Sequence, residues 1–123
     1  MTIIEAINKI DSLKPNNYTQ GDKIAWLSTL DGNIKTEIID THEGAESVEF
    51  NGYDVDTSLE TVLLVPAPYD DIYIKGLEAQ IDYANGEIGK YNNSMAMHNT
   101  AYSAFKRHFN RTHMPIGKSI KFN

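Results

Sequence analysis

The chain has 123 residues, no cysteine and a net charge of −6. A chain of this length is typical of one domain with its own apolar core, and without cysteine it has neither disulfides nor thiolate metal sites. The amino end carries Glu5, Lys9 and Asp11, and no apolar run approaches the roughly 20 residues of a membrane span, so we expect no signal peptide and no membrane partner.

Two helices are predicted in the first third of the chain. Apolar residues at three- and four-residue steps predict a helix over about 2–13, with Thr2 as its N-cap. A second helix is predicted over about 19–40, with Thr19 as its N-cap and Asp22 in its first turn. Its apolar stripe consists of Ile24, Leu27, Leu30, Ile34 and Ile38.

Residues 46–65 have a different pattern. Residues 47–55 alternate between apolar and polar around Asn51-Gly52, a pair that strongly favours the tight turn of a β-hairpin. We therefore predict a hairpin with its tip at Phe50, Asn51, Gly52 and Tyr53. This insertion is expected to project from the helices and to face a channel or a neighbouring subunit, because loops on a packed scaffold often carry function.

Two longer helices are predicted after the insertion, over about 69–90 and 94–112. The first follows Pro68 and has acids in its opening turn. The link between them is expected at 91–93, around Asn92-Asn93, with Ser94 as N-cap. A short link favours an antiparallel pair. The predicted core of this pair comprises Leu77, Ile81, Ala84, Tyr102, Phe105 and Phe109.

These elements predict a mainly α fold: one domain over 1–123, a four-helix bundle-like structure with a small β-hairpin or loop insertion between the second and third helices. Residues 116–123 are expected to form a flexible basic tail. Flexible segments of this kind are suited to adding a strand to the edge of a partner's sheet.

No residue pattern predicts an active site or a cofactor. His108 and His113 are five residues apart and do not share a helical face, and no Glu completes a His-Glu-x-x-His motif. His98 falls in an apolar stripe, which favours a hydrogen-bonded core or interface histidine. We therefore predict no catalytic residue, no metal site and no cofactor.

The acidic residues do not clearly predict a metal site or a catalytic site either. Asp54, Asp56, Ser58 and Glu60 alternate as in the opening of a calcium loop, but the glycine and the bidentate glutamate of that loop are missing. Asp70 and Asp71 could act as an acid and a base, yet acids at a helix start are already favoured by the helix dipole. Solvated acids are the better interpretation of both groups.

Charge is distributed very unevenly along the chain. Residues 1–60 contain 12 acids and 4 bases, whereas residues 91–123 contain no acid and 5 bases. Opposite-sign surfaces steer and orient association between proteins. We therefore predict an interface with a neighbouring subunit or another protein. The residues assigned to it are Lys106, Arg107, Arg111, Lys118, Lys121 and Phe122, with the first three on one helical face.

Long segments of the chain resemble a family of small head–tail connector (adaptor) proteins of tailed bacteriophages of Gram-positive hosts. The resemblance covers VPAPYDDIYIKGLEAQIDYANGEIGKYNNS and FNRTHMP, and extends to NKIDSLKPNNYTQGDKIAWLSTLDGNIKTEIIDTHEG near the amino end. It is a likeness of whole segments without a catalytic signature. Gly76 departs from the family pattern, in which a large aromatic residue is usual, and this affects the packing expected around the third helix.

The resemblance implies a non-enzymatic structural protein at the head–tail junction of the virion, present in the host cytoplasm during assembly. Copies of the chain would form a ring under the portal protein and extend the DNA channel. They would also offer a docking surface to a tail-side connector or tail terminator. Packaged DNA would pass through without sequence-specific binding.

Two other functions remain open from the residues alone. A small nucleic-acid-binding helical module could use the basic last helix as a recognition helix, although the net charge of −6 disfavours it. A small hydrolase could use the clustered acids, but no nucleophile, base or metal set accompanies them.

Overall fold

The computed structural model describes residues 1–116; the predicted tail with Lys118, Lys121 and Phe122 lies outside this range. Four α-helices and two short 3₁₀ turns form the fold, and these residues include no β-strand. The predicted mainly helical, bundle-like domain is therefore confirmed. The helices are α1 (Ile3–Leu13), α2 (Gln20–Glu37), α3 (Asp71–Ala84) and α4 (Ile88–Thr112), with η1 (Ile39–Thr41) and η2 (Ala45–Ser47) after α2.

The first two helices begin where the sequence predicts. The hydroxyl of Thr2 accepts the N–H of Glu5, and the Glu5 carboxylate accepts the N–H of Thr2. Thr19 and Asp22 form the same reciprocal pair at the start of α2. Each capping box satisfies two backbone donors that a helix start would otherwise leave unpaired.

The predicted link at Asn92-Asn93 is wrong, because α3 ends earlier and both asparagines lie within α4. Gly86 adopts φ +72°, a left-handed conformation that glycine tolerates at no steric cost. The N–H of Gly86 donates to the Tyr83 carbonyl and that of Glu87 donates to the Asp82 carbonyl, both at 3.0 Å. This pair of bonds is a Schellman motif, which ends α3 and starts the turn into α4.

Ser94, predicted as the N-cap of the last helix, instead lies inside α4 and is buried. Its hydroxyl donates to Asp82 of α3 at 2.6 Å. Lys14, just after α1, forms an ion pair with the same carboxylate. Asp82 therefore connects α1, α3 and α4, and a buried charge is tolerated there because it is paired and hydrogen-bonded.

The predicted hairpin in residues 46–65 is also wrong. The described part of the chain has no paired strands in this segment, only an isolated antiparallel bridge between Thr2 and Val62. The backbone instead donates to side chains of helices: Tyr53 N–H to Ser28 Oγ at 2.9 Å and Leu64 N–H to Asp31 Oδ2 at 3.1 Å. Donors bonded to helical side chains are not available to a partner strand.

The insertion is consequently part of the packed domain rather than an excursion from it. Leu63 and Val65 are buried in the core. Towards α1, the N–H groups of Ile3 and Ile4 donate to the carbonyls of Thr61 and Leu59, each at 3.0 Å. Deleting residues 48–55 would remove Tyr53, which bonds to α2 through both its N–H and its hydroxyl. We therefore expect that deletion to destabilise the fold.

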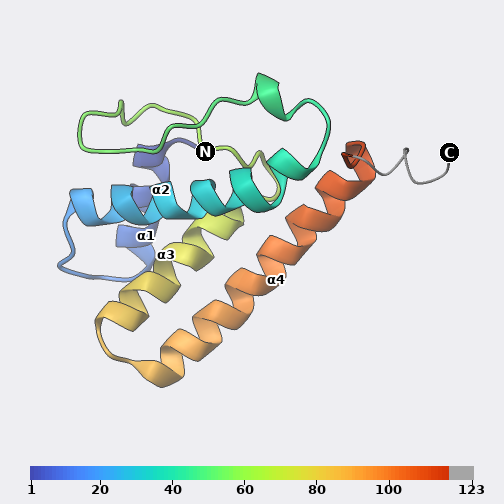
Figure 1. Ribbon diagram of the computed structural model, residues 1–123. Coiled ribbons are helices and arrows are strands. Elements are labelled where there is room, and N and C mark those ends of the chain that lie inside the picture. The colour runs from blue at the N-terminus through green and yellow to red at the C-terminus, as the bar shows by residue number, and fades with distance from the viewer. Residues whose placement is uncertain (117–123) are drawn as a thin grey trace, which may run out of the picture.

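Helices α3 and α4 pack against each other as the predicted pair, with α4 turning back along α3 (Figure 1). Leu77, Ile81 and Phe105 are buried, as predicted, and Tyr102 and Phe109 are half-buried. Ala84 is exposed, because the Schellman turn comes directly after it and carries the chain away from the core. The prediction for Ala84 is therefore wrong.

Helix α4 is the longest element, with 25 residues, of which Ser94 and Phe105 alone are buried. Its far end is held by His42, whose ring nitrogens contact the Ile38 carbonyl at 2.7 Å and Asn110 Oδ1 at 2.8 Å. His42 is thus a buried link between the end of α2 and α4. Most of α4 is left as accessible surface.

Candidate interaction surface

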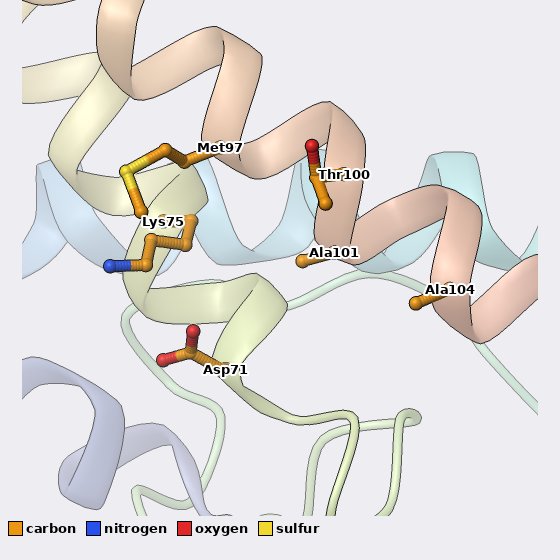
Figure 2. A pocket seen from close by; sticks show the side chains of 6 residues that line it. All are labelled: Asp71, Lys75, Met97, Thr100, Ala101 and Ala104. Atoms are coloured by element: carbon orange, nitrogen blue, oxygen red, sulfur yellow. The ribbon is translucent and has the colours of Figure 1, made fainter.

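A groove between α3 and α4 is an apolar hollow on this accessible surface. It has a volume of about 380 Å³, and Figure 2 shows its lining side chains. Helix α3 contributes the two charged members, Asp71 and Lys75, and α4 contributes the rest. The α4 members are Met97, Thr100, Ala101 and Ala104.

The groove is lined by small or flexible side chains of α4. Ala101 and Ala104 are half-buried and leave space above the helix, while Met97 is 52% exposed at the edge. The Thr100 hydroxyl donates to the Ala96 carbonyl at 3.0 Å, so its donor is already used. Lys75 lies 3.7 Å from Glu78, and Asp71 is exposed. The groove therefore offers an apolar floor with charge at its α3 edge.

Two of the predicted basic residues extend this face. Met97, Thr100 and Ala104 are followed at three- and four-residue steps by Arg107 and Arg111, and residues so spaced share one side of a helix. We call these five residues the groove face. Both arginines are exposed, and none of the ion pairs within residues 1–116 includes them.

Lys106 is exposed but lies on a different side of α4, so the prediction of one basic face for all three cations is wrong. It shares its side with Asn99, Ser103 and Asn110, again at three- and four-residue steps. An adjacent position in sequence corresponds to a rotation of about 100° around a helix. Lys106 therefore provides a natural control for the role of Arg107 and Arg111.

The predicted insertion tip does not project. Gly52 has φ +87°, and a Cβ there would lie 3.3 Å from Ser28 Oγ, so the turn follows α2 closely. Phe50 and Tyr53 contact each other edge to face, with ring centres 5.1 Å apart. The Tyr53 hydroxyl donates to the buried Asp31. Phe50 and Tyr53 of this tip are half-buried, whereas Asn51 and Gly52 are exposed.

A second, more polar hollow of about 280 Å³ lies between α2 and α4. Within it, the Tyr102 hydroxyl donates to Glu37 at 3.1 Å, and burial together with this carboxylate raises the Tyr102 pKa to about 12. Burial lowers the pKa of His98, and the hydrogen bond between its Nδ1 and the Ile72 carbonyl opposes this effect. His98 is thus the hydrogen-bonded histidine that its place in the stripe predicts.

Asp31, which the sequence pattern did not single out, organises the insertion. Its carboxylate accepts the hydroxyls of Tyr53 and Tyr73 and the N–H of Leu64. Burial raises the pKa of Asp31, and these three donors oppose that effect. The available signal was its spacing: Asp31 is four residues after Leu27 and three before Ile34, in the apolar stripe of α2.

Residues 1–116 also provide information on metal ligands and membrane-spanning helices. Within residues 1–116, no three His, Asp or Glu side chains come together in a way that could hold a metal ion. No helix in this range is both long and apolar enough to span a membrane. Comparisons with protein-family models, curated proteins and solved structures found no match to this chain.

Proposed function

We propose that this protein is a structural head–tail connector of a tailed bacteriophage or prophage, without enzymatic activity. Copies of the chain would assemble as a ring under the portal protein, extend the DNA channel and bind a tail-side connector or terminator. The protein would then reside at the head–tail junction of the virion and in the host cytoplasm during assembly. The resemblance of its long sequence segments to such adaptors supports this assignment.

The structural observation that best supports the proposal is the exposed groove face of α4. A 25-residue helix without an acid, buried at two positions, leaves a long surface for another protein. The acids of the chain are concentrated elsewhere, in residues 1–60. A ring with head-to-tail contacts needs two different complementary surfaces on each subunit. Separated apolar-basic and acidic regions meet that requirement, and their charges would orient the contact.

Genetic complementation tests the function. A phage that lacks this gene is supplied with the wild-type chain, with Arg107→Glu/Arg111→Glu or with Lys106→Glu. We expect the double variant to fold but to leave heads that lose DNA or fail to accept tails. The Lys106 variant should support normal virions because it changes a different side of α4. Normal head completion by the Arg107/Arg111 variant would contradict the proposed role of this face.

Genome context and electron microscopy provide independent tests. The gene should lie between portal and capsid genes on one side and tail genes on the other. Purified chain mixed with the corresponding portal protein should form ring-shaped complexes visible by electron microscopy. A different gene neighbourhood, together with no binding to portal, would overturn the assignment.

The alternative of a nucleic-acid-binding module is favoured by one observation, the acid-free α4 with two exposed arginines on one face. These cations would contact few phosphates, and each contact contributes only about 0.9 to the slope of log K against log salt for duplex DNA. Fluorescence anisotropy with labelled DNA at several salt concentrations separates the two functions. Strong, salt-dependent binding lost in the Arg107→Glu/Arg111→Glu variant would favour the alternative over the connector.

A further inference from the structure

The Asp54–Thr57 turn is largely exposed and internally hydrogen-bonded, and it contains two acids and one apolar residue. Thr57 N–H donates to the Asp54 carbonyl at 3.1 Å, and Asp56 N–H donates to Asp54 Oδ1 at 2.8 Å. Asp54 N–H in turn donates to Thr57 Oγ1 at 2.9 Å. Val55, between the two acids, is nevertheless 76% exposed. The turn thus holds a branched apolar side chain outward with a carboxylate on each side.

Val55 is one of several exposed large apolar side chains of residues 1–116, and among them it alone has an acid on each side in the sequence. The segment after Val55 is also hydrogen-bonded. Thr61 N–H donates to the Ser58 carbonyl, and the Thr61 carbonyl accepts the N–H of Ile3 at the start of α1. Ordering a loop before it binds lowers the entropy cost of association. A preformed apolar side chain between two charges is therefore well suited to a complementary surface.

The groove face has the complementary properties. The α3/α4 groove is apolar, its volume of about 380 Å³ leaves room for a valine side chain, and Arg107 and Arg111 continue the same side of α4. Neither arginine takes part in an ion pair among residues 1–116. An apolar contact flanked by opposite charges provides both burial and orientation.

The turn and the carboxyl end of α4, where Arg111 lies, are at opposite ends of α2. Val55 lies beside Gly21, where a Cβ would be 3.7 Å from Val55 Cγ1, whereas Asn110 of α4 contacts His42 just beyond the end of α2. Gly21 and Ile38 are separated by about 25 Å at 1.5 Å per residue. In Figure 1 the segment after α2 begins near the end of α4 and runs across the molecule to the opposite side.

We propose that the Asp54–Thr57 turn of one copy docks into the α3/α4 groove of a second copy, with Val55 in the groove and the carboxylates of Asp54 and Asp56 facing Arg107 and Arg111. This inference rests on the proposed connector function and specifies the contact between its subunits. Because the two surfaces differ, each copy can both give and receive the contact, which allows a closed ring.

The contact is small, and stable interfaces usually bury about 1,200–2,000 Å². Subunits in dilute solution should therefore associate weakly and assemble efficiently when a template such as the portal holds them side by side. Measurements on the isolated chain consequently need high protein concentration and a covalent readout.

Disulfide cross-linking tests the contact directly, because the natural chain has no cysteine. The full-length Val55→Cys/Ala104→Cys variant, oxidised at high concentration, should give dimers and higher oligomers on a non-reducing gel. The matched control, Val55→Cys/Lys106→Cys, uses the same turn and helix but another side of α4, and should remain monomeric. Absence of oligomers with the first pair, or equal oligomers with both, would overturn the proposal.

Charge exchange on the Val55→Cys/Ala104→Cys background gives a second test. Asp56→Lys or Arg107→Glu alone should cause loss of the oligomer bands, and the two together should restore them. Asp54 is left unchanged because its carboxylate holds the turn. Restoration indicates that these charges meet across the contact, whereas loss that persists in the combined variant would contradict the proposed pairing.

The outcome is separable from the connector function, because cross-linking requires no portal. Portal binding and head completion without Val55–Ala104 cross-links would leave the function standing and overturn this contact. Specific cross-links without portal binding would support the contact and contradict the connector assignment.

Discussion

The phenolic oxygen of Tyr73 lies 2.6 Å from Asp31 Oδ1 in the interior of the protein, although the two residues are 42 positions apart. The same Tyr73 oxygen accepts the N–H of Val65 at 2.7 Å. One hydroxyl thus connects α3, α2 and the end of the insertion. It satisfies a buried backbone donor and contributes a hydrogen bond to a buried carboxylate, neither of which has access to water.

Replacing Tyr73 with Phe should destabilise the protein by about 1–3 kcal/mol, because Val65 N–H and Asp31 Oδ1 both lose a partner while remaining buried. Urea unfolding followed by circular dichroism measures the change. Tyr83→Phe is the matched control, since Tyr83 is 62% exposed and should tolerate the same deletion. Equal stabilities of the two variants would show that the Tyr73 hydroxyl contributes nothing.

Gly76 allows α2 to approach α3 closely. A Cβ at this position would lie 2.7 Å from Leu30 Cδ1 and 3.3 Å from His98 Nδ1. Gly76→Leu should therefore cost about 1–3 kcal/mol through overpacking. Adding Leu30→Ala should recover part of that loss, because the new side chain can then occupy the vacated space. Strictly additive effects of the two changes in urea unfolding would contradict this coupling.

Phe105 is the large apolar residue of α4 that is fully enclosed, with 2% of its surface exposed. We expect Phe105→Ala to cost about 3–5 kcal/mol through lost burial and the cavity left behind. Ile88→Ala, at a position 59% exposed at the start of the same helix, should change stability little. A melting temperature unaffected by Phe105→Ala would contradict the assigned packing.

Asp82 should make stability depend on acid pH. Its burial tends to raise the pKa, but the hydrogen bonds from Lys14 and Ser94 outweigh burial and lower the pKa below the ordinary value of 3.8. A lowered folded-state pKa contributes stability that is present above 3.8 and is lost as pH falls through the folded pKa.

The measurement for Asp82 is urea unfolding of the wild type and of Asp82→Asn between neutral and strongly acid pH. The wild type should be the more stable protein at neutral pH, and the difference should shrink on acidification below 3.8. Asp31 has the opposite effect on stability. Burial raises its pKa, so its contribution to the stability of the folded protein grows as pH falls. The comparison therefore uses the difference between the two proteins, and a difference independent of pH would contradict the prediction.

Features that depend only on neighbouring residues were predictable from the sequence. Thr2 with Glu5 and Thr19 with Asp22 form their capping boxes within three residues, so the helix starts were predictable. Burial of Leu77, Ile81 and Phe105 also followed from periodicity, because a helix has one apolar side whatever it packs against.

The remaining features depend on contacts between segments that are distant in the sequence. Asn51-Gly52 favours a hairpin locally, but donors around it pair with Ser28 and Asp31 of α2, which lie more than 20 residues earlier in the chain. The separation of Val55 from the carboxyl end of α4 likewise depends on the length of α2. A local sequence pattern does not identify hydrogen-bond partners that are distant in the chain. The position of the insertion and the accessible side of α4 therefore follow only from the packing of the helices.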